Sequence, residues 1–212
     1  DGDGMQFDRN SFLSLHLALQ RRLSSLILKY LSPEKPTYDH DKVEAIREAI
    51  CRNIPPSSKL DIGMGLQFVR EYDRIRIGLN DPSDAKTNYV YPLEHPPSER
   101  VVPEAKMVFR LQLTTPQAVT EQRGLSFDDS LMLDYDQVAF PLFVRSRRPG
   151  DRMRIKGLNG SKKVKDIFID AKLPPSVRRS IPLLTDCRGE ILWIPGVRRS
   201  DHARITGATK RI

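Results

Sequence analysis

The segment RSRRPGDRMRIK, residues 145–156, has the pattern of two short strands joined by a turn at Pro149-Gly150. Side chains alternate between the two faces of a strand, so every second residue after the turn is expected to share a face. One face then carries cations, namely Arg152, Arg154 and Lys156. The other carries Met153 and Ile155, which we expect in the core. The segment therefore predicts a two-stranded element with a basic outer face.

The basic pattern continues on the other side of the turn. Arg145 and Arg147 are spaced to face together, and Arg148 follows directly. A guanidinium grips phosphate through two parallel hydrogen bonds, so such a cluster suits a nucleic-acid backbone. Asp151 is expected to pair with a neighbouring arginine and to hold the turn. A solvated edge strand, whose charges deter aggregation, is the alternative that this segment alone leaves open.

A second basic segment covers residues 157–172, where Ser161 is expected to cap a helix over 162–172. The buried side of this helix would hold Val164, Ile167, Phe168 and Ala171. Its first turn would carry three cations, Lys162, Lys163 and Lys165. The positive end of a helix dipole disfavours each of them by a few tenths of a kcal/mol, roughly, whereas a bound phosphate would reverse the sign. We therefore predict a phosphate contact here; a merely solvated helix start is the alternative.

The remaining candidates for nucleic-acid contact are Arg178, Arg198 and Arg199, with Arg21 and Arg22 as weaker candidates on an N-terminal helix. Trp193 lies among aliphatic residues, which favours a core position over a platform on which a base stacks.

Charge is distributed unevenly along the 212 residues, whose net charge is +8. Residues 141–212 hold eighteen Lys or Arg against six Asp or Glu, whereas the first 140 hold seventeen against twenty-one. A basic region of this kind attracts polyanions, of which nucleic acid is the commonest partner. No run approaches the roughly 20 apolar residues of a membrane span, and no basic amphipathic helix is present, so no membrane partner is expected.

No catalytic or metal site is predicted. Two distant cysteines argue against a disulfide framework or a zinc site and favour a reducing cytoplasm. The four histidines, His16, His40, His95 and His202, have no partner at a metal-ligand spacing. The segment GMGLQF at 63–68 lacks the third glycine of a dinucleotide fingerprint.

The N-terminal part predicts a helical domain with a hairpin, over residues 1–82. Apolar residues recur at helical spacing over 11–31, in the stripe Phe12, Leu15, Leu19, Leu23, Leu26, Ile27 and Tyr30. A second helix is expected over 41–51, and period-two patterning over 59–78 predicts a hairpin that turns at 71–73. The polar segment 80–84 is the expected linker.

Residues 83–212 predict a small, mostly-β domain with one or two short helices, so the fold class is α+β. The expected strands are 87–91, 106–114, 131–134, 141–147, 152–156, 183–185, 191–194 and 203–206.

Three blocks taken together resemble one family: RRPGDRMR at 147–154, GSKKVKDIFIDAKLP at 160–174 and GEILWIPGVRRSD at 189–201, with Arg178 and Pro182 between the last two. Their order and spacing resemble the C-terminal domain of tRNA isoleucine-lysidine synthetases, most diagnostically over 141–206. The helix segment ALQRRL at 18–23 is similar, more loosely, to that family's intermediate tRNA-binding domain. Residues 85–140 are the least diagnostic.

The resemblance implies an ATP-dependent ligase that attaches lysine to the wobble cytidine of isoleucine tRNA, anticodon CAU, and so forms lysidine. In the family the chemistry belongs to an N-terminal PP-loop domain with a Ser-Gly-Gly-x-Asp-Ser motif, which is absent from this sequence. The catalytic residues and the ATP and magnesium sites are therefore expected outside this chain, which begins like the middle of a longer protein. The expected role here is tRNA binding at the acceptor end. A stand-alone, non-enzymatic RNA-binding module and a homodimerisation domain stay open as alternatives.

Overall fold

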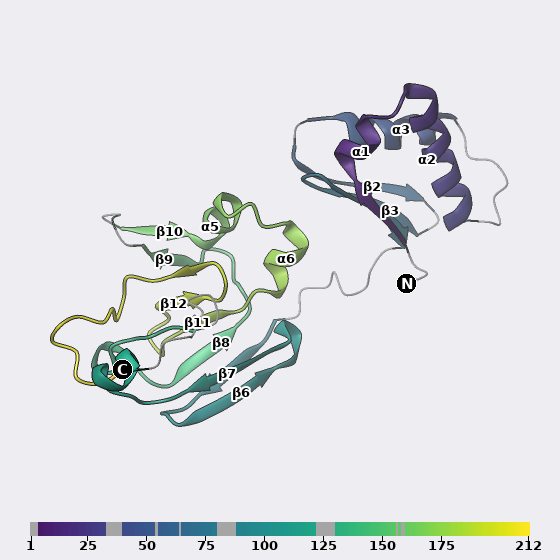
Figure 1. The fold of residues 1–212 in the computed structure, drawn as a ribbon. Coiled ribbons are helices and arrows are strands. Elements are labelled where there is room, and N and C mark those ends of the chain that lie inside the picture. Colours follow the sequence, from purple (N-terminus) through teal and green to yellow (C-terminus); the bar gives the residue numbers. More distant parts are fainter. Residues whose placement is uncertain are drawn as a thin grey trace. The chain divides into compact units, whose positions relative to one another are not determined.

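The structure is a computed structural model that describes residues 4–32, 40–53, 55–63, 65–79, 88–121, 130–155, 157 and 160–212. The chain forms two compact units, unit 1 (Asp1–Asp84) and unit 2 (Ala85–Ile212) (Figure 1). Unit 1 has one cluster of buried apolar residues and unit 2 has two. In the described ranges no helix is long and apolar enough to cross a membrane.

Unit 1 packs helices against one antiparallel sheet, with strand order β1-β4-β3-β2. The strands are β1 (Gly4–Asp8), β2 (Ser57–Gly63), β3 (Leu66–Glu71) and β4 (Arg74–Leu79). The helices are α1 (Arg9–Leu13), α2 (Leu17–Leu31) and α3 (His40–Cys51), and they lie on one side of the sheet (Figure 1). Phe12, Leu28 and Ile46 from the helices meet Phe68 and Ile77 from the sheet in one core. The hairpin β3–β4 turns where the sequence predicts it, and β1 and β2 extend it to four strands.

The helix predicted over 11–31 is wrong in one respect, because the structure has two helices there. Asp8 caps α1 by accepting from the Ser11 backbone N–H at 2.8 Å, and His16 Nδ1 accepts from the Ala18 N–H at 3.3 Å to start α2. Because α2 starts anew at Leu17, a different set of its residues faces the core than one continuous helix would present. Three residues expected to be buried are exposed instead: Leu19, Leu26 and Tyr30. The buried face of α2 is formed by Gln20, Ser24, Ile27 and Leu28.

Arg9 ties α1 to the end of α3. Its guanidinium donates to the carbonyls of Ile50 at 2.7 Å and Cys51 at 3.0 Å, and to Asn53 Oδ1 at 2.8 Å. The last carbonyls of a helix have no partner within the helix and carry partial negative charge. A buried cation at this position therefore satisfies them and fixes the N-terminal segment to the helical layer.

Unit 2 is built on a five-stranded antiparallel sheet with the order β13-β12-β11-β8-β5. Its strands are β5 (Val90–Leu93), β8 (Leu142–Arg145), β11 (Leu183–Thr185), β12 (Ile191–Ile194) and β13 (Arg198–Arg199). Two ribbons accompany it, β6 (Ser98–Val102) with β7 (Met107–Leu111) and β9 (Arg152–Arg154) with β10 (Ser161–Lys163). The helices are α4 (Pro116–Glu121), α5 (Val164–Asp170) and α6 (Pro175–Ser180), with 3-10 turns η2 (Pro103–Ala105) and η3 (Tyr135–Gln137).

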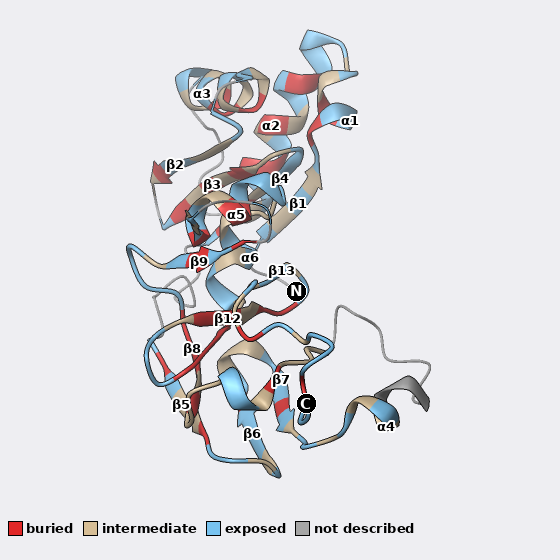
Figure 2. Cartoon of the chain, turned by 90° about the vertical axis from the view of Figure 1, so that its left-hand side faces the viewer, coloured by how far each residue is buried: buried red, intermediate tan, exposed pale blue. Residues whose placement is uncertain are grey.

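Each face of this sheet packs against a different core, as alternation along its strands requires. Leu184 and Leu192 join the cluster that includes Val102 and Phe109 of the β6–β7 ribbon. Their chain neighbours Leu183 and Ile191 join the cluster that includes β9 and α5. Figure 2 shows buried residues along β8 and β12. The central strands are therefore apolar on both sides, as buried strands should be.

The mixed class predicted from the sequence is confirmed, since the described chain is mostly β-sheet with a few helices. Several boundaries in unit 2 differ from the prediction. The strands expected at 131–134 and 203–206 are irregular, whereas β6, β10, β13, α4 and α6 were not predicted. Asp134 explains the first difference: its carboxylate accepts from Thr209 Oγ1 at 2.7 Å and its N–H donates to the Ala203 carbonyl at 2.8 Å. The chain bends around these distant partners, which local patterning cannot reveal.

Candidate nucleic-acid interface

Three basic segments that are separate in the sequence come together on unit 2. Strand β9 pairs with β10, which joins residues 152–154 to 161–163. The carbonyl of Arg154 also accepts from Asp201 N–H at 3.2 Å and from Ser200 Oγ at 3.3 Å, which brings the segment after β13 beside β9. Beneath them, Met153, Phe168 and Ile194 share one core cluster. The fold therefore gathers residues from all three blocks at one place.

The outer face of the β9–β10 ribbon is basic. Lys163 lies directly opposite Arg152, and paired residues of antiparallel strands share a face. Arg152, Arg154 and Lys163 are exposed, whereas Met153 is 1% exposed and Ile155 is 5%. This is the alternation that the sequence predicts. Arg152 donates to Ser161 Oγ at 2.8 Å and to the Ser161 carbonyl, which holds its side chain along the ribbon. Lys156 lies outside the described residues.

The turn before β9 is organised by Asp151, as predicted, but the prediction that Arg145 faces outward with Arg147 is wrong. Arg145 is 7% exposed, and its guanidinium donates to both carboxylate oxygens of Asp151 at 2.8 and 2.9 Å. Asp151 also accepts from the Arg148 N–H at 2.7 Å. Val144 and Arg145 are both buried at the end of β8, and through its bonds to Asp151 Arg145 supports the turn from inside the fold. Arg147 and Arg148 are exposed above it.

The three lysines do not all lie in the first turn of a helix, so that part of the prediction is also wrong. Pairing with β9 keeps Ser161–Lys163 extended, and α5 begins at Val164 with Lys163 as its N-cap. Lys162 lies on the Met153 side of the ribbon and forms an ion pair with Asp170 at the end of α5. Only Lys165 occupies the first turn of the helix, and it is exposed.

The other candidates lie at different places. Arg198 and Arg199 form β13 and are exposed. Arg178 lies in α6, partly buried, and its Nε donates to the Leu173 carbonyl at 2.7 Å. Trp193 packs in the core cluster as expected, with its ring edge-on to Phe109 at 6.2 Å between centroids.

The two weaker candidates belong to unit 1. Arg22 is exposed on α2. Arg21 Nε is 2.5 Å from Glu44 Oε1, and Arg47 Nε is 2.9 Å from the other oxygen. These hydrogen bonds from Arg21 and Arg47 lower the pKa of Glu44 to about 2. Arg21 therefore joins α2 to α3, which is a structural role.

The positive charge of unit 2 is only partly neutralised. Among the candidates, ion pairs join carboxylates to Arg145, Arg154 (3.5 Å from Glu190) and Lys162, and elsewhere in unit 2 Arg110, Arg204 and Arg211 are also paired. Six of the candidates are exposed and form no ion pair with a carboxylate in the part of the chain that is described: Arg147, Arg148, Arg152, Lys163, Lys165 and Arg198. Exposed guanidinium and ammonium groups at this density attract phosphate. Among the described residues no group of His, Cys, Asp and Glu could hold a metal ion.

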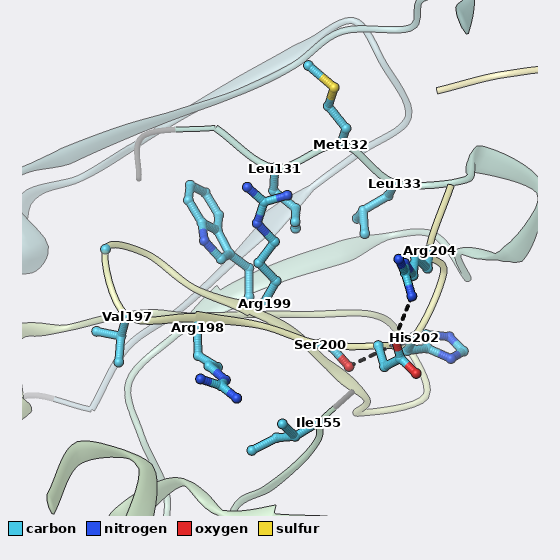
Figure 3. Close-up of a pocket in the computed structure, with 13 residues that line it drawn as sticks. Leu131, Met132, Leu133, Ile155, Val197, Arg198, Arg199, Ser200, His202 and Arg204 are labelled. Atoms are coloured by element: carbon cyan, nitrogen blue, oxygen red, sulfur yellow. Dashed lines mark hydrogen bonds and ion pairs between the residues drawn. The ribbon is translucent and has the colours of Figure 1, made fainter. Parts of the chain in front are cut away.

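A groove beside the basic ribbon is not predicted by the sequence. Three depressions, of about 400, 220 and 630 Å³, all include Ile155 in their lining. In the first, Leu131 and Leu133 lie on one side and Arg198 on another, while the Arg199 side chain reaches toward Leu131 (Figure 3). Two features of the sequence could have pointed to this groove, namely the apolar run at 131–133 and His202. The first has the pattern of a strand, and the second has no metal-binding partner, so neither indicates a groove.

Comparisons with known proteins point to one family. The family model described as the TilS substrate C-terminal domain matches residues 142–212. A bifunctional protein TilS/HprT of Listeria monocytogenes serotype 4b is 36% identical over 91% of this chain and 28% of its own length. The tRNA(Ile)-lysidine synthases of Bacillus licheniformis and Bacillus subtilis are each 34% identical, over 93% and 92% of this chain and 40% of their own lengths. The chain thus spans less than half the length of these curated relatives.

A solved structure described as the crystal structure of the TILS C-terminal domain is also similar. It is 34% identical to this chain, and the match covers 58% of this chain and 92% of that one, with a TM-score of 0.48.

Proposed function

Because the chain belongs to the tRNA(Ile)-lysidine synthase family, we propose that it is the tRNA-binding portion of a ligase that attaches lysine to the wobble cytidine of isoleucine tRNA. The observation that carries the proposal is the cluster of exposed cations on unit 2, where the β9–β10 ribbon, the 147–148 turn and β13 come together. The partner in this proposal is the isoleucine tRNA with anticodon CAU. The protein acts in the cytoplasm, where tRNA is modified.

The ligase reaction itself belongs, in this proposal, to a PP-loop catalytic domain outside these 212 residues. We assign ATP and magnesium to that domain, because the sequence of this chain has no PP-loop motif. Unit 1 corresponds to the intermediate substrate-binding domain, and unit 2 to the C-terminal domain. A homodimer is not needed for either role.

The chemistry of the surface suits a role in positioning. Phosphate contacts supply affinity and register without reading the sequence of the RNA. Double-helical RNA is recognised mainly by its shape and backbone, for which exposed cations are sufficient. Contacts far from the modified base hold the anticodon in place before the reaction and lower its entropic cost. The arginines of unit 2 thereby contribute to the rate without touching the reacting atoms.

The test is to replace Arg147, Arg148, Arg152 and Lys163 by Gln in one variant. Filter binding to the tRNA is measured between about 50 and about 200 mM salt, where the slope of log affinity against log salt reports phosphate contacts. We expect weaker binding and a slope shallower by about 0.7 to 0.9 for each phosphate that the variant no longer neutralises.

The matched control removes four exposed cations from elsewhere in unit 2, at Arg100, Lys106, Arg110 and Lys210. Equal weakening in the two variants would mean that general positive charge, rather than this surface, binds the RNA. The absence of saturable binding by the unaltered chain would overturn the proposed function itself.

A further inference from the structure

The groove beside the basic ribbon has a chemistry that phosphate binding alone does not require. We propose that it takes one unpaired nucleotide, with the base in the apolar groove and the phosphate on the arginine rim. The proposal rests on the proposed function in one respect, namely that the nucleotide is supplied by the bound RNA. A phosphate-only surface needs cations and no cavity, whereas this surface has both.

The first depression, of about 400 Å³, is large enough for a small ligand, and its walls combine apolar and polar side chains. Leu131, Leu133 and Val197 are partly exposed there, and Ile155 lies at the point that all three depressions share. Trp193 completes the lining from β12. A flat heteroaromatic base gains by leaving water for such a surface, and every base has a face that packs against it.

The rim supplies charge of the sign that a phosphate needs. Arg198, Arg199 and Arg204 line the first depression, and Arg198 also lines the second. Arg204 Nη1 is 3.7 Å from Asp201 Oδ1 (Figure 3). This exposed ion pair holds the Arg204 guanidinium at the edge of the groove. Arginine is suited to this place because its planar guanidinium both packs against rings and binds phosphate in a forked geometry.

His202 gives a third, independent indication. Its Nε2 is buried and has no hydrogen-bond partner among the described residues, although the residue lines both the first and the third depressions. The backbone around it is held in place, because His202 N–H donates to Ser200 Oγ at 3.1 Å and Asp201 N–H to the Arg154 carbonyl at 3.2 Å. Buried polar atoms without a partner are rare in folded proteins. The polar edge of a base would supply the missing hydrogen bond.

Apolar walls, arginines and a histidine nitrogen without a partner in the described part of the chain together fit a whole nucleotide better than a phosphate or a base alone. Inorganic phosphate would leave the apolar walls unused, and an apolar ligand would leave the arginines and Nε2 unused. A base within a double helix is stacked between its neighbours, so the nucleotide must be unpaired. Two sources share this chemistry, a single-stranded stretch of RNA, such as the 3′ end of a tRNA, and a free mononucleotide.

The experiment uses the only tryptophan of the chain, Trp193, as its own reporter. Its fluorescence is followed while the 212-residue chain is titrated with four probes: whole tRNA, the same tRNA trimmed of its unpaired 3′ nucleotides, a single-stranded tetranucleotide, and AMP. Linear polyphosphate is the base-free control. We expect quenching by tRNA and by the tetranucleotide, and none by polyphosphate. Trimming should abolish quenching and weaken binding about tenfold, the effect of removing one stacked base.

Two variants with one matched control locate the effect. His202→Ala should weaken tetranucleotide binding about tenfold without loss of thermal stability, because it removes a buried atom that has no partner among the described residues. Arg198→Gln should weaken binding of the tetranucleotide more than Arg188→Gln does. Both remove one exposed positive charge, but Arg188 lies in the turn between β11 and β12 and lines none of the three depressions.

The outcomes separate this inference from the proposed function. Quenching by the tetranucleotide that needs about tenfold more ligand in His202→Ala supports the groove site even if whole tRNA fails to bind. Quenching by AMP with the affinity of the tetranucleotide assigns the site to a free nucleotide. The inference is overturned if whole tRNA binds equally well after trimming, after His202→Ala, and whichever of Arg198 and Arg188 is replaced. That outcome leaves the proposed function standing.

Discussion

At the scale of single residues, the most informative finding concerns an arginine that the fold buries. Arg145 is chemically identical to its neighbours Arg147 and Arg148, yet the fold buries it against Asp151. A buried cation left without its partner is costly, and removing one member of such a pair destabilises by about 3–5 kcal/mol. The identity of the residue therefore says little about its role until burial is known.

The first prediction follows from this pair. Asp151→Asn keeps an oxygen for the Arg148 N–H but removes the charge beside Arg145, and we expect it to lower the free energy of unfolding by about 3 kcal/mol in urea titrations. Asp170→Asn breaks the more exposed pair with Lys162 and should cost less than about 1 kcal/mol. Equal effects of the two substitutions would show that the Arg145 pair contributes no more than a surface pair.

A second prediction concerns pH and Glu44 of unit 1. Hydrogen bonds from Arg21 and Arg47 lower the pKa of this carboxyl from 4.5 to about 2. A lowered folded-state pKa means that the stabilisation is complete above pH 4.5 and is lost as the pH falls toward 2. In Glu44→Gln, the melting temperature of unit 1 should fall less steeply as the pH is lowered from 4.5 toward 2. The melting temperature is measured by circular dichroism. Glu48→Gln removes a carboxylate from the same helix, 3.7 Å from Arg52, and should leave the fall in place.

At the scale of elements, the turn that presents Arg147 and Arg148 depends on backbone conformation. Gly150 has a φ of +87°, which only glycine adopts without cost, although a Cβ there would meet no atom within 4 Å. We expect Gly150→Ala to cost about 1 kcal/mol through conformation alone. Gly207→Ala also has free space but no positive φ, and should be neutral or slightly stabilising. Denaturant unfolding of the two variants makes the comparison.

The element scale also shows what the sequence could predict. The alternation of Arg152, Met153 and Arg154 revealed the buried and exposed faces of β9, because it depends only on the two-residue period of a strand. The helix start at Ser161 was wrong, because pairing with β9 outweighed the local capping signal. The groove could not be predicted at all. It needs residues 131–133, 155 and 197–204 side by side, and the contacts that join them are long-range.

At the scale of the whole molecule, the separate cores predict separate unfolding. Phe68 belongs to the core of unit 1 and Phe168 to a core of unit 2, and both are fully buried. Replacing either by Ala should cost its own unit about 3–5 kcal/mol. Differential scanning calorimetry is then expected to resolve two transitions, of which Phe68→Ala lowers one and Phe168→Ala the other. A single transition lowered equally by both substitutions would show that the units unfold together.

The buried pair at the base of the turn also constrains how the gene can vary. A lineage that loses the codon for Asp151 keeps a stranded cation, and one that loses the codon for Arg145 keeps a stranded anion, whereas joint replacement by apolar residues can be neutral. Residues 145 and 151 should therefore co-vary among homologues, being retained together or replaced together. Positions 147 and 148 should vary independently.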